Sequence, residues 1–415
     1  MRFFNTTTFS AVSILFIFYL IAIAPGCSKS TVTAPDNIQN TEGTFYIQVL
    51  QQSGGFRLDK VDAGTGFTGW EIPMMNTFAS FGSPVDYSDG LLFHGNYSGV
   101  SAYNIQSSEP QWGVGWLATT EASSARILAF KDSLVFFASS SNSYSSADAY
   151  CVNKYNGAII WQQRIDSGGW TFYNFSSIPV VSDDKPIMLT RDKNGHKQLR
   201  AFRATDGKLV WQSPINDLLL PTIKTDNGKI YATGGGFMFC YNATDGSLLW
   251  KTDIRYKNAF GVYFFYDDTK LVVAADGWPV MVLDKTNGTI LSSFDLPLPV
   301  TNPNSFLYKD NVLYASGLPI DTVFQVRAFD ITAKTQKWIF RYTTNRYSQA
   351  SPIITDKYLV VPVSTAEPSD VNNNQLKMIF VDFSGKLVKQ FPFLGYSADH
   401  FIYVNSNNVY REQMY

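Results

Sequence analysis

One phrase recurs along the sequence and constrains the fold more than any other feature. The segment TDGKLVW ends at Trp211, and TDGSLLW ends at Trp250 with the same Asp-Gly turn pair, leucine and tryptophan. Six related segments share the spacing: TGFTGW at Trp70, SSEPQW at Trp112, YNGAIIW at Trp161, TNGTILS at Ser292, AKTQKW at Trp338 and FSGKLVK at Lys389. These eight copies lie 39 to 51 residues apart. A period of this size, with several strands in each copy, is typical of a β-propeller.

Each copy is consistent with two hairpins. Before the tryptophan, Asn-Gly and Asp-Gly pairs such as Asn156-Gly157 predict two-residue hairpin loops, which need residues at positive φ. The turn glycines of the copies are Gly66, Gly157, Gly207, Gly246, Gly288 and Gly385. Upstream, segments such as SPVDYSDGLLFHG and PTIKTDNGKIYATG read as two apolar strands around an Asp/Gly turn. We therefore expect an all-β fold, a single propeller of four-stranded antiparallel blades over residues 43–415, with eight blades and seven as the alternative.

The tryptophans of the repeat need a common structural role. A buried tryptophan removes about 150–250 Å² from water and carries one N–H donor, so it can wedge between neighbouring blades. We expect this blade-docking role for Trp70, Trp112, Trp161, Trp211, Trp250 and Trp338, and little contribution from Ser292 and Lys389 in the same slot. Beyond the last slot, DHFIYVNSNNVYREQMY alternates apolar and polar residues. This C-terminal segment is predicted to complete the first blade and close the ring, which removes open strand edges.

The N-terminal residues are predicted to be a targeting sequence rather than part of the fold. The fourteen residues AVSILFIFYLIAIA form an apolar core that is too short to span a bilayer and suits a signal peptide over residues 1–26. The following APGC looks like a bacterial lipobox, in which Cys27 would be lipidated. Residues 27–42 are polar and predict a flexible tether. The alternatives are an ordinary signal peptide with a chance cysteine, or an uncleaved anchor.

The repeat also resembles a known family. Its pattern is similar to the docking motif Ala-x-Asp-x-x-Thr-Gly-x-x-x-Trp of PQQ-like (quinoprotein-type) propellers, and it is clearest in the copies ending at Trp161, Trp211 and Trp250. With the lipobox, the chain is similar to the BamB family of outer-membrane assembly lipoproteins, which are eight-bladed propellers. The departures are the missing tryptophan in copies six and eight and the insertions SSSNSYSSADAY and STAEPSDVNNNQ.

The resemblance implies a non-catalytic lipoprotein of the bacterial cell envelope, held at the outer membrane facing the periplasm. It would bind envelope proteins as an assembly scaffold, as a monomer that contacts the membrane by its lipid anchor only and carries no cofactor. A quinone- and calcium-dependent oxidoreductase-like propeller, or a small-molecule or glycan-binding module, remain alternatives.

The composition narrows these alternatives. A formal net charge of −1 gives no reason to expect a nucleic acid partner. The three histidines, His94, His196 and His400, lack metal-ligand spacing and are expected in turns or loops. The sequence has no adjacent cysteine pair and no Cys-x-x-Cys-His haem motif. Cys151 and Cys240 occupy equivalent strand positions two blades apart and are predicted to be free thiols.

The candidate binding surface is one mouth of the central channel. Loops from each docking strand to the innermost strand of the next blade should converge there. They hold arginines and aromatic residues, the composition of interaction hot spots. The candidates are Trp170, Tyr173, Arg255, Tyr256, Asn258, Asn302, Arg346 and Tyr347. The alternative is that these residues plug the channel or cover the blade tops.

Overall fold

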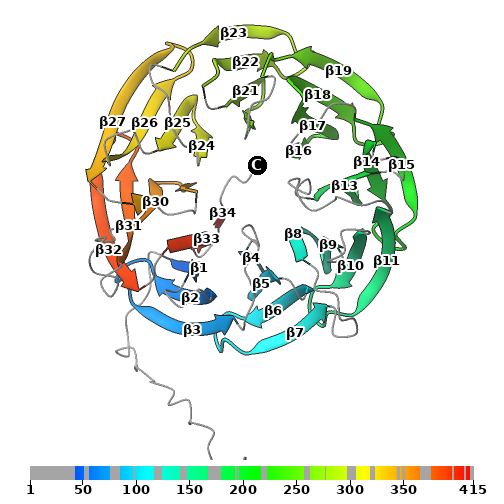
Figure 1. Ribbon diagram of the computed structural model, residues 1–415, viewed down its shortest axis with the longest axis horizontal. Coiled ribbons are helices and arrows are strands. Elements are labelled where there is room, and N and C mark those ends of the chain that lie inside the picture. The colour runs from blue at the N-terminus through cyan, green and yellow to red at the C-terminus, as the bar shows by residue number, and fades with distance from the viewer. Residues whose placement is uncertain are drawn as a thin grey trace, which may run out of the picture. The chain divides into compact units, whose positions relative to one another are not determined.

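The computed structural model is a ring of eight antiparallel blades around a common central axis (Figure 1). It contains no α-helix in the part of the chain that it describes. The described residues are 43–50, 56–74, 85–96, 99–115, 124–140, 147–166, 179–191, 194, 196–215, 222–256, 262–275, 277–296, 305–317, 323–343, 346–347, 351–364, 375–394, 397–405 and 408–411. The predicted all-β, eight-bladed propeller is confirmed. The signal peptide, the tether and Cys27 lie outside these residues.

The strands of each blade follow one another from the channel to the rim. Blades 1 to 4 consist of β34 (Val409–Arg411), β33 (Ser397–Val404), β1 (Thr44–Leu50), β2 (Phe56–Asp62) and β3 (Thr68–Met74); β4 (Val85–Ser88), β5 (Leu91–Asn96), β6 (Gly99–Asn104) and β7 (Pro110–Gly115); β8 (Ser124–Lys131), β9 (Leu134–Ser140), β10 (Ala147–Asn153) and β11 (Ile159–Asp166); and β12 (Val180–Ser182), β13 (Lys185–Arg191), β14 (Lys197–Phe202) and β15 (Leu209–Pro214).

Blades 5 to 8 repeat the pattern. They consist of β16 (Ile223–Asp226), β17 (Lys229–Gly234), β18 (Phe237–Asn242) and β19 (Leu248–Asp253); β20 (Tyr263–Tyr266), β21 (Lys270–Ala274), β22 (Val280–Asp284) and β23 (Ile290–Phe294); β24 (Ser305–Lys309), β25 (Val312–Gly317), β26 (Val323–Asp330) and β27 (Thr335–Thr343); and β28 (Arg346–Tyr347), β29 (Ile353–Ile354), β30 (Tyr358–Ser364), β31 (Gln375–Asp382) and β32 (Leu387–Leu394). In blade 8, β28 and β29 both pair with β30 on its channel side.

The middle strands are apolar on both faces because each blade is packed between two neighbours. In β17 and β18, nearly every side chain of KIYATG and FMFCYN is buried. Along the rim the pattern changes to alternation, and in β15 only Trp211 and Ser213 of LVWQSP are buried. A strand with one covered face has this period of two, whereas a strand covered on both faces reads as a continuous apolar run.

The turns before the tryptophans, here called the outer turns, differ from the prediction. They are four-residue loops rather than two-residue hairpin loops. In blade 3, the Gly157 N–H donates to the Asn153 oxygen (2.9 Å) and the Asn153 N–H donates to the Ala158 oxygen (2.9 Å). Asn156 does not adopt a positive φ, and its side chain instead accepts the Ala158 N–H (3.0 Å). Only the glycine is left-handed, with φ of 69°.

The two-residue turns with two left-handed residues are the inner turns, between the two strands nearest the channel. They are Asp89-Gly90, Asp183-Asp184, Asn227-Gly228 and Asp310-Asn311, in blades 2, 4, 5 and 7. Such turns match the right-handed twist of the strands they join. The sequence prediction therefore assigned the correct turn chemistry to the wrong hairpin.

Each rim strand contains a bulge directly before the docking slot. In blade 5, Cys240 pairs with Trp250 and Tyr241 pairs with Leu248, so Leu249 is the extra residue. The same register shift occurs in all eight blades. A bulge bends a strand and re-aims the next side chain. Here it directs the residue in the docking slot toward the neighbouring blade.

The docking residue meets the next blade at a fixed point of the outer turn. The Trp161 Nε1–H donates to the Ala204 oxygen of blade 4 (2.8 Å). Ala243 has the equivalent position in blade 5, where its N–H donates to the Gly228 oxygen of the inner turn (2.8 Å). Equivalent indole bonds are Trp70 to Ile105 (3.0 Å), Trp112 to Lys154 (2.8 Å), Trp211 to Ala243 (3.0 Å) and Trp338 to Phe383 (2.9 Å). These bonds join the rim strand of one blade to the outer turn of the next blade at five of the eight seams.

The outer-turn glycine provides the room that the indole needs. A Cβ built on Gly207 would lie 2.6 Å from the Trp161 ring, and one on Gly157 would lie 2.8 Å from the Trp112 ring. Real Cβ atoms essentially never approach that closely, so in these two blades the glycine leaves the room that the ring occupies. Blades 2 and 7 lack the glycine and hold Ser108 and Lys334 at φ of 60° and 58° instead.

Three docking slots depart from this scheme. The slot of blade 6 holds Ser292, which has no ring. Among the described residues, the buried Trp250 Nε1 has no hydrogen-bond partner. Lys389, expected to contribute little, takes over the role of an indole: its Nζ donates to the Ala63 oxygen (2.9 Å) of blade 1 and lies 4.4 Å from the Phe380 ring centroid. The expectation of little contribution from Lys389 did not foresee this contact, in which a lysine supplies the same donor over an aromatic ring.

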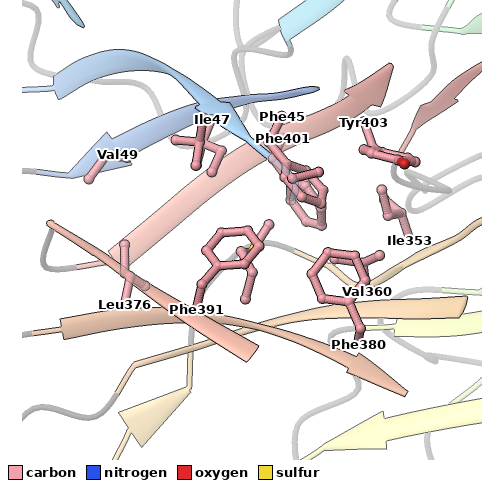
Figure 2. Packing of buried hydrophobic residues seen from close by; sticks show 13 residues of the cluster. Phe45, Ile47, Val49, Ile353, Val360, Leu376, Phe380, Phe391, Phe401 and Tyr403 are labelled. Atoms are coloured by element: carbon pink, nitrogen blue, oxygen red, sulfur yellow. The ribbon is translucent and has the colours of Figure 1, made fainter. Parts of the chain in front are cut away.

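The ring closes between blade 8 and the two ends of the chain. As predicted, the C-terminal segment completes blade 1: β33 pairs with β1, from Thr44 opposite Val404 to Leu50 opposite Ser397. Figure 2 shows the core of this seam, where Phe45 of β1 lies among aromatic rings of β31, β32 and β33. Ring centroids are 4.9 Å apart for Phe45 and Tyr403 and 5.8 Å for Phe45 and Phe380. Phe391 also covers Gly66, as the indoles cover their glycines.

Candidate functional site

The predicted channel mouth lies mostly outside the described residues. Trp170, Tyr173, Asn258 and Asn302 are among the residues that the structure leaves undescribed. Arg346 and Tyr347 form β28, where they pair with Ser364 and Val363. Only Arg255 and Tyr256 are described with their side chains.

In blade 5, the segment after β19 is attached to the turn between β17 and β18. The N–H groups of Ile254 (2.8 Å) and Arg255 (3.1 Å) both donate to the Gly236 oxygen. Asp253 accepts the Arg255 N–H as well (2.8 Å), and this holds Arg255 at a φ of 61°. An exposed arginine is thereby presented at the end of the blade opposite the outer turn.

The buried side chain of Tyr256 anchors this segment to blade 6. It is 2% exposed, its hydroxyl donates to the Val273 oxygen (3.1 Å), and its ring lies 5.6 Å from Trp278. Burial raises its pKa far above the ordinary tyrosine value. Tyr256 therefore anchors the loop, and of the two described side chains only Arg255 is available to a partner.

Two charged side chains on the innermost strands, Lys224 and Arg411, bind groups of the neighbouring blade. Burial lowers the pKa of Lys224 on β16 to about 8, and its Nζ donates to the Phe264 oxygen (2.8 Å) of blade 6. Arg411 on β34 binds Asp86 on β4 (2.5 Å), a carboxyl whose pKa burial raises while the arginine opposes the shift. These pairs join neighbouring blades and close the inner edge between blades 1 and 2.

The cysteines and histidines complete the inventory of reactive side chains. Cys151 and Cys240 are buried free thiols, as predicted, and burial raises their pKa to about 12 and about 11. His94 on β5 and His400 on β33 lie in strands rather than in turns, so that expectation was wrong for both. Within the described ranges, no group of three His, Cys, Asp or Glu side chains could hold a metal ion.

A second surface was not anticipated from the sequence. The first two residues of the rim strand are exposed aliphatic pairs in five blades, with exposed fractions between 38% and 54%. They are Ile159-Ile160, Leu209-Val210, Leu248-Leu249, Ile290-Leu291 and Leu387-Val388. We call these ten residues the aliphatic rim. The aliphatic pairs before five of the docking slots are visible in the repeat, but without knowledge of the bulge they resemble ordinary strand residues.

The described part of the chain holds no helix long and apolar enough to cross a membrane. A comparison with curated protein sequences finds no match. A family model described as "Outer membrane protein assembly factor BamB" matches residues 34–163, 195–315 and 240–390.

Several solved structures share this fold at low sequence identity. BamB from Moraxella catarrhalis is 13% identical with a TM-score of 0.52, covering 79% of this chain and 94% of its own. A quinohemoprotein alcohol dehydrogenase, ADHIIG, from Pseudomonas putida HK5 is 10% identical with a TM-score of 0.55, covering 81% and 71%. Sqt1 from Saccharomyces cerevisiae is 11% identical with a TM-score of 0.55, covering 81% and 96%.

These structures share the fold alone, since identities this low carry no function with them. The family model is more specific, because its matches together cover residues 34–163 and 195–390, which include most of the repeats. Together, the eight-bladed ring, the repeated docking junction and a match over more than half of the chain show that this protein belongs to the BamB family of outer-membrane protein assembly factors.

Proposed function

We propose that the protein is a non-catalytic, lipid-anchored scaffold of the bacterial cell envelope that binds protein partners in outer-membrane protein assembly. The observation that carries the proposal is the family match over residues 34–163 and 195–390. The APGC segment after an apolar stretch of fourteen residues supports anchoring at Cys27.

The geometry of blade 5 supports a partner surface at the channel mouth. Arg255 is exposed, and its backbone is fixed by bonds to Gly236 and Asp253. An arginine that is already ordered loses less conformational freedom on binding, and arginine is enriched at interaction hot spots. The partner would be a component of the assembly machinery for outer-membrane β-barrels.

The experiment is a complementation assay in cells that lack this chain. We expect the amount of folded outer-membrane β-barrel protein to fall by about twofold or more, and the wild-type chain to restore it. Arg255→Glu should restore it only in part, because a buried interface tolerates a reversed charge poorly. The matched control is Lys208→Glu, an exposed charge reversal in the outer turn of the neighbouring blade.

Unchanged β-barrel levels in the deletion strain would contradict the assembly role. Equal restoration by Arg255→Glu and Lys208→Glu would contradict the assignment of the mouth. Acylation is checked separately: the mass of the mature wild-type chain should include two acyl chains, and Cys27→Ala should leave the membrane fraction, since a dual lipid is its strong anchor.

The oxidoreductase alternative has its own test. Purified protein is incubated with pyrroloquinoline quinone and calcium, and alcohol oxidation is followed with an artificial electron acceptor. The scaffold proposal expects no turnover above the protein-free control. Turnover would move the assignment to the quinone-dependent enzymes that share this ring.

A further inference from the structure

The aliphatic rim is a consequence of the bulge and not of chance exposure. In a regular strand, one of two successive side chains points toward the neighbouring blade. The bulge at Leu249 breaks that alternation, so Leu248 and Leu249 are both about half exposed. The same holds for the pairs in blades 3, 4, 6 and 8, whereas blades 1, 2 and 7 have Thr68-Gly69, Pro110-Gln111 and Gln336-Lys337 there.

All five pairs lie at one face of the ring. They directly follow the outer turns, and the outer turns are hydrogen-bonded to the inner turns of the same blades. The Lys154 N–H donates to Ser133 (2.7 Å), the Ala243 N–H to Gly228 (2.8 Å) and the Ile331 N–H to Asn311 (3.1 Å). We call this face, which carries the inner and outer turns, the turn face. The mouth residue Arg255 follows the other end of β19.

The polypeptide enters the ring at the same face. The Ala63 N–H donates to the Gly43 oxygen (3.0 Å), so Gly43 occupies the place that an inner turn has in the other blades. Residues 28–42 separate Gly43 from Cys27, and this segment can extend at most roughly 55 Å. An acylated Cys27 would therefore keep the point where the chain enters the turn face within that distance of the bilayer.

We infer that the occupant of the aliphatic rim is the lipid bilayer itself: the turn face rests on the membrane and the rim side chains enter its interfacial region. This inference rests on the proposed lipid anchor and adds a second membrane contact to it. A flat surface such as a bilayer can meet all five pairs at once, because they lie along the edge of a single face of the ring. The exposed Tyr155 in the outer turn of blade 3 adds an aromatic side chain of the kind found at membrane interfaces.

The charges of the turn face indicate which lipids fit. Its inner turns carry Asp89, Asp132, Asp184 and Asp310, and lysines such as Lys131 and Lys154 pair with the first three. Such a mixed surface gains little from anionic headgroups, unlike a polybasic one. We expect contact with zwitterionic phospholipid.

The test places a fluorophore at either end of one strand in the acylated mature protein. Leu248→Cys labels β19 at the turn face, and Asp253→Cys labels it about 17 Å away at the other end. Cys151 and Cys240 are buried and will not label in the folded protein. The protein is inserted into phosphatidylcholine vesicles whose acyl chains are brominated near the headgroup, and bromine quenches only a dye close to it.

We expect the Leu248→Cys dye to be quenched about threefold or more beyond the Asp253→Cys dye, since interfacial side chains lie only about 5–10 Å deep. Changing Leu209, Val210, Ile290 and Leu291 to serine should remove at least about half of that quenching by deleting apolar contact. The matched control replaces the polar bulge residues Gln111 and Lys337 with serine and should leave it unchanged.

Equal quenching at both ends, or stronger quenching at Asp253→Cys, would overturn the inference. A dimer in sedimentation that depends on the aliphatic rim would assign it to a second copy instead, and rim crosslinks to a protein without lipid quenching would assign it to that protein. An unacylated mature chain defeats the proposed anchor, whereas an acylated chain with equal quenching defeats only the placement of the rim.

Discussion

The seam between blades 3 and 4 and the seam between blades 8 and 1 solve the same problem with different side chains. Trp161 alone supplies the ring over Gly207 and the donor to Ala204. At the closing seam the two roles are separated: Phe391 covers Gly66, and Lys389 donates to Ala63. The comparison teaches that these two seams both combine a ring over a glycine with a donor to a carbonyl, and that the indole is one way to combine them.

The largest expected effect breaks an indole seam outright. Trp161→Ala removes a side chain that is 6% exposed and lies between Phe136 and Phe202. We expect the free energy of unfolding to fall by about 3–5 kcal/mol, the range for a truncated buried tryptophan. Urea denaturation followed by far-ultraviolet circular dichroism measures it. A loss below about 1 kcal/mol would show that the seam does not depend on its indole.

The next prediction tests how closely the outer-turn glycine packs against the indole, by comparing two glycine-to-alanine substitutions. Gly207→Ala and Gly228→Ala impose the same backbone strain, at φ of 69° and 70°, which costs about 1–2 kcal/mol. A Cβ at Gly228 meets nothing within 4 Å, whereas one at Gly207 meets the Trp161 ring. Gly207→Ala should therefore lose a further ~1–3 kcal/mol from overpacking. Equal losses in urea denaturation would refute the close packing of glycine and indole.

A third substitution tests the donor at the closing seam. Lys389→Met keeps the stem over Phe380 but leaves the Ala63 oxygen without its charged donor, and we expect a loss of about 1–2 kcal/mol. The control is Lys251→Met, since Lys251 lies 3.7 Å from the Phe237 ring centroid on the exposed rim. That variant should lose less than ~1 kcal/mol. The comparison fails if the control loses as much as Lys389→Met in thermal unfolding.

The smallest effect isolates the indole N–H. Both substitutions replace the indole with a smaller aromatic ring and remove its N–H. In Trp161→Phe this N–H makes a 2.8 Å hydrogen bond, whereas in Trp250→Phe it has no partner in the described structure. The two should differ by about 1 kcal/mol, the net worth of one hydrogen bond. Calorimetric melting of both variants decides it, and a larger loss for Trp250→Phe would mean that its donor is satisfied in solution.

The sequence predicted the ring well because the repeat carries the fold eight times. Copies that match the repeat motif poorly, such as SSEPQW, were placed correctly because their spacing from well-matched copies is regular. It failed where one residue's role depends on a partner distant in the chain. The donor role of Lys389 needs Ala63, which is 326 residues away, and no local pattern reveals that contact.

The predictions of the outer-turn type and of which rim residues are exposed failed for a related reason. Asn-Gly and Asp-Gly fit both a two-residue loop and a four-residue loop, and the bulge that decides between the registers is set by pairing with the preceding strand. The bulge also decides that Leu248 and Leu249 are both exposed. At the candidate mouth, Tyr256 and Arg255 have the same sequence context, and only packing against Trp278 buries the tyrosine.

The pairing of β33 with β1 has a consequence for the order of events during synthesis. The strands β1, β2 and β3 of blade 1 are synthesised before the strands of blades 2 to 8, yet β33 (Ser397–Val404), which pairs with β1, is synthesised after them. Until β33 is available, β1 exposes a strand edge of the kind that pairs with other chains. We expect nascent chains that end before Ser397 to be held by chaperones or to aggregate, because this pairing is between segments far apart in the sequence. The first blade to be started is therefore the last of the eight to be completed.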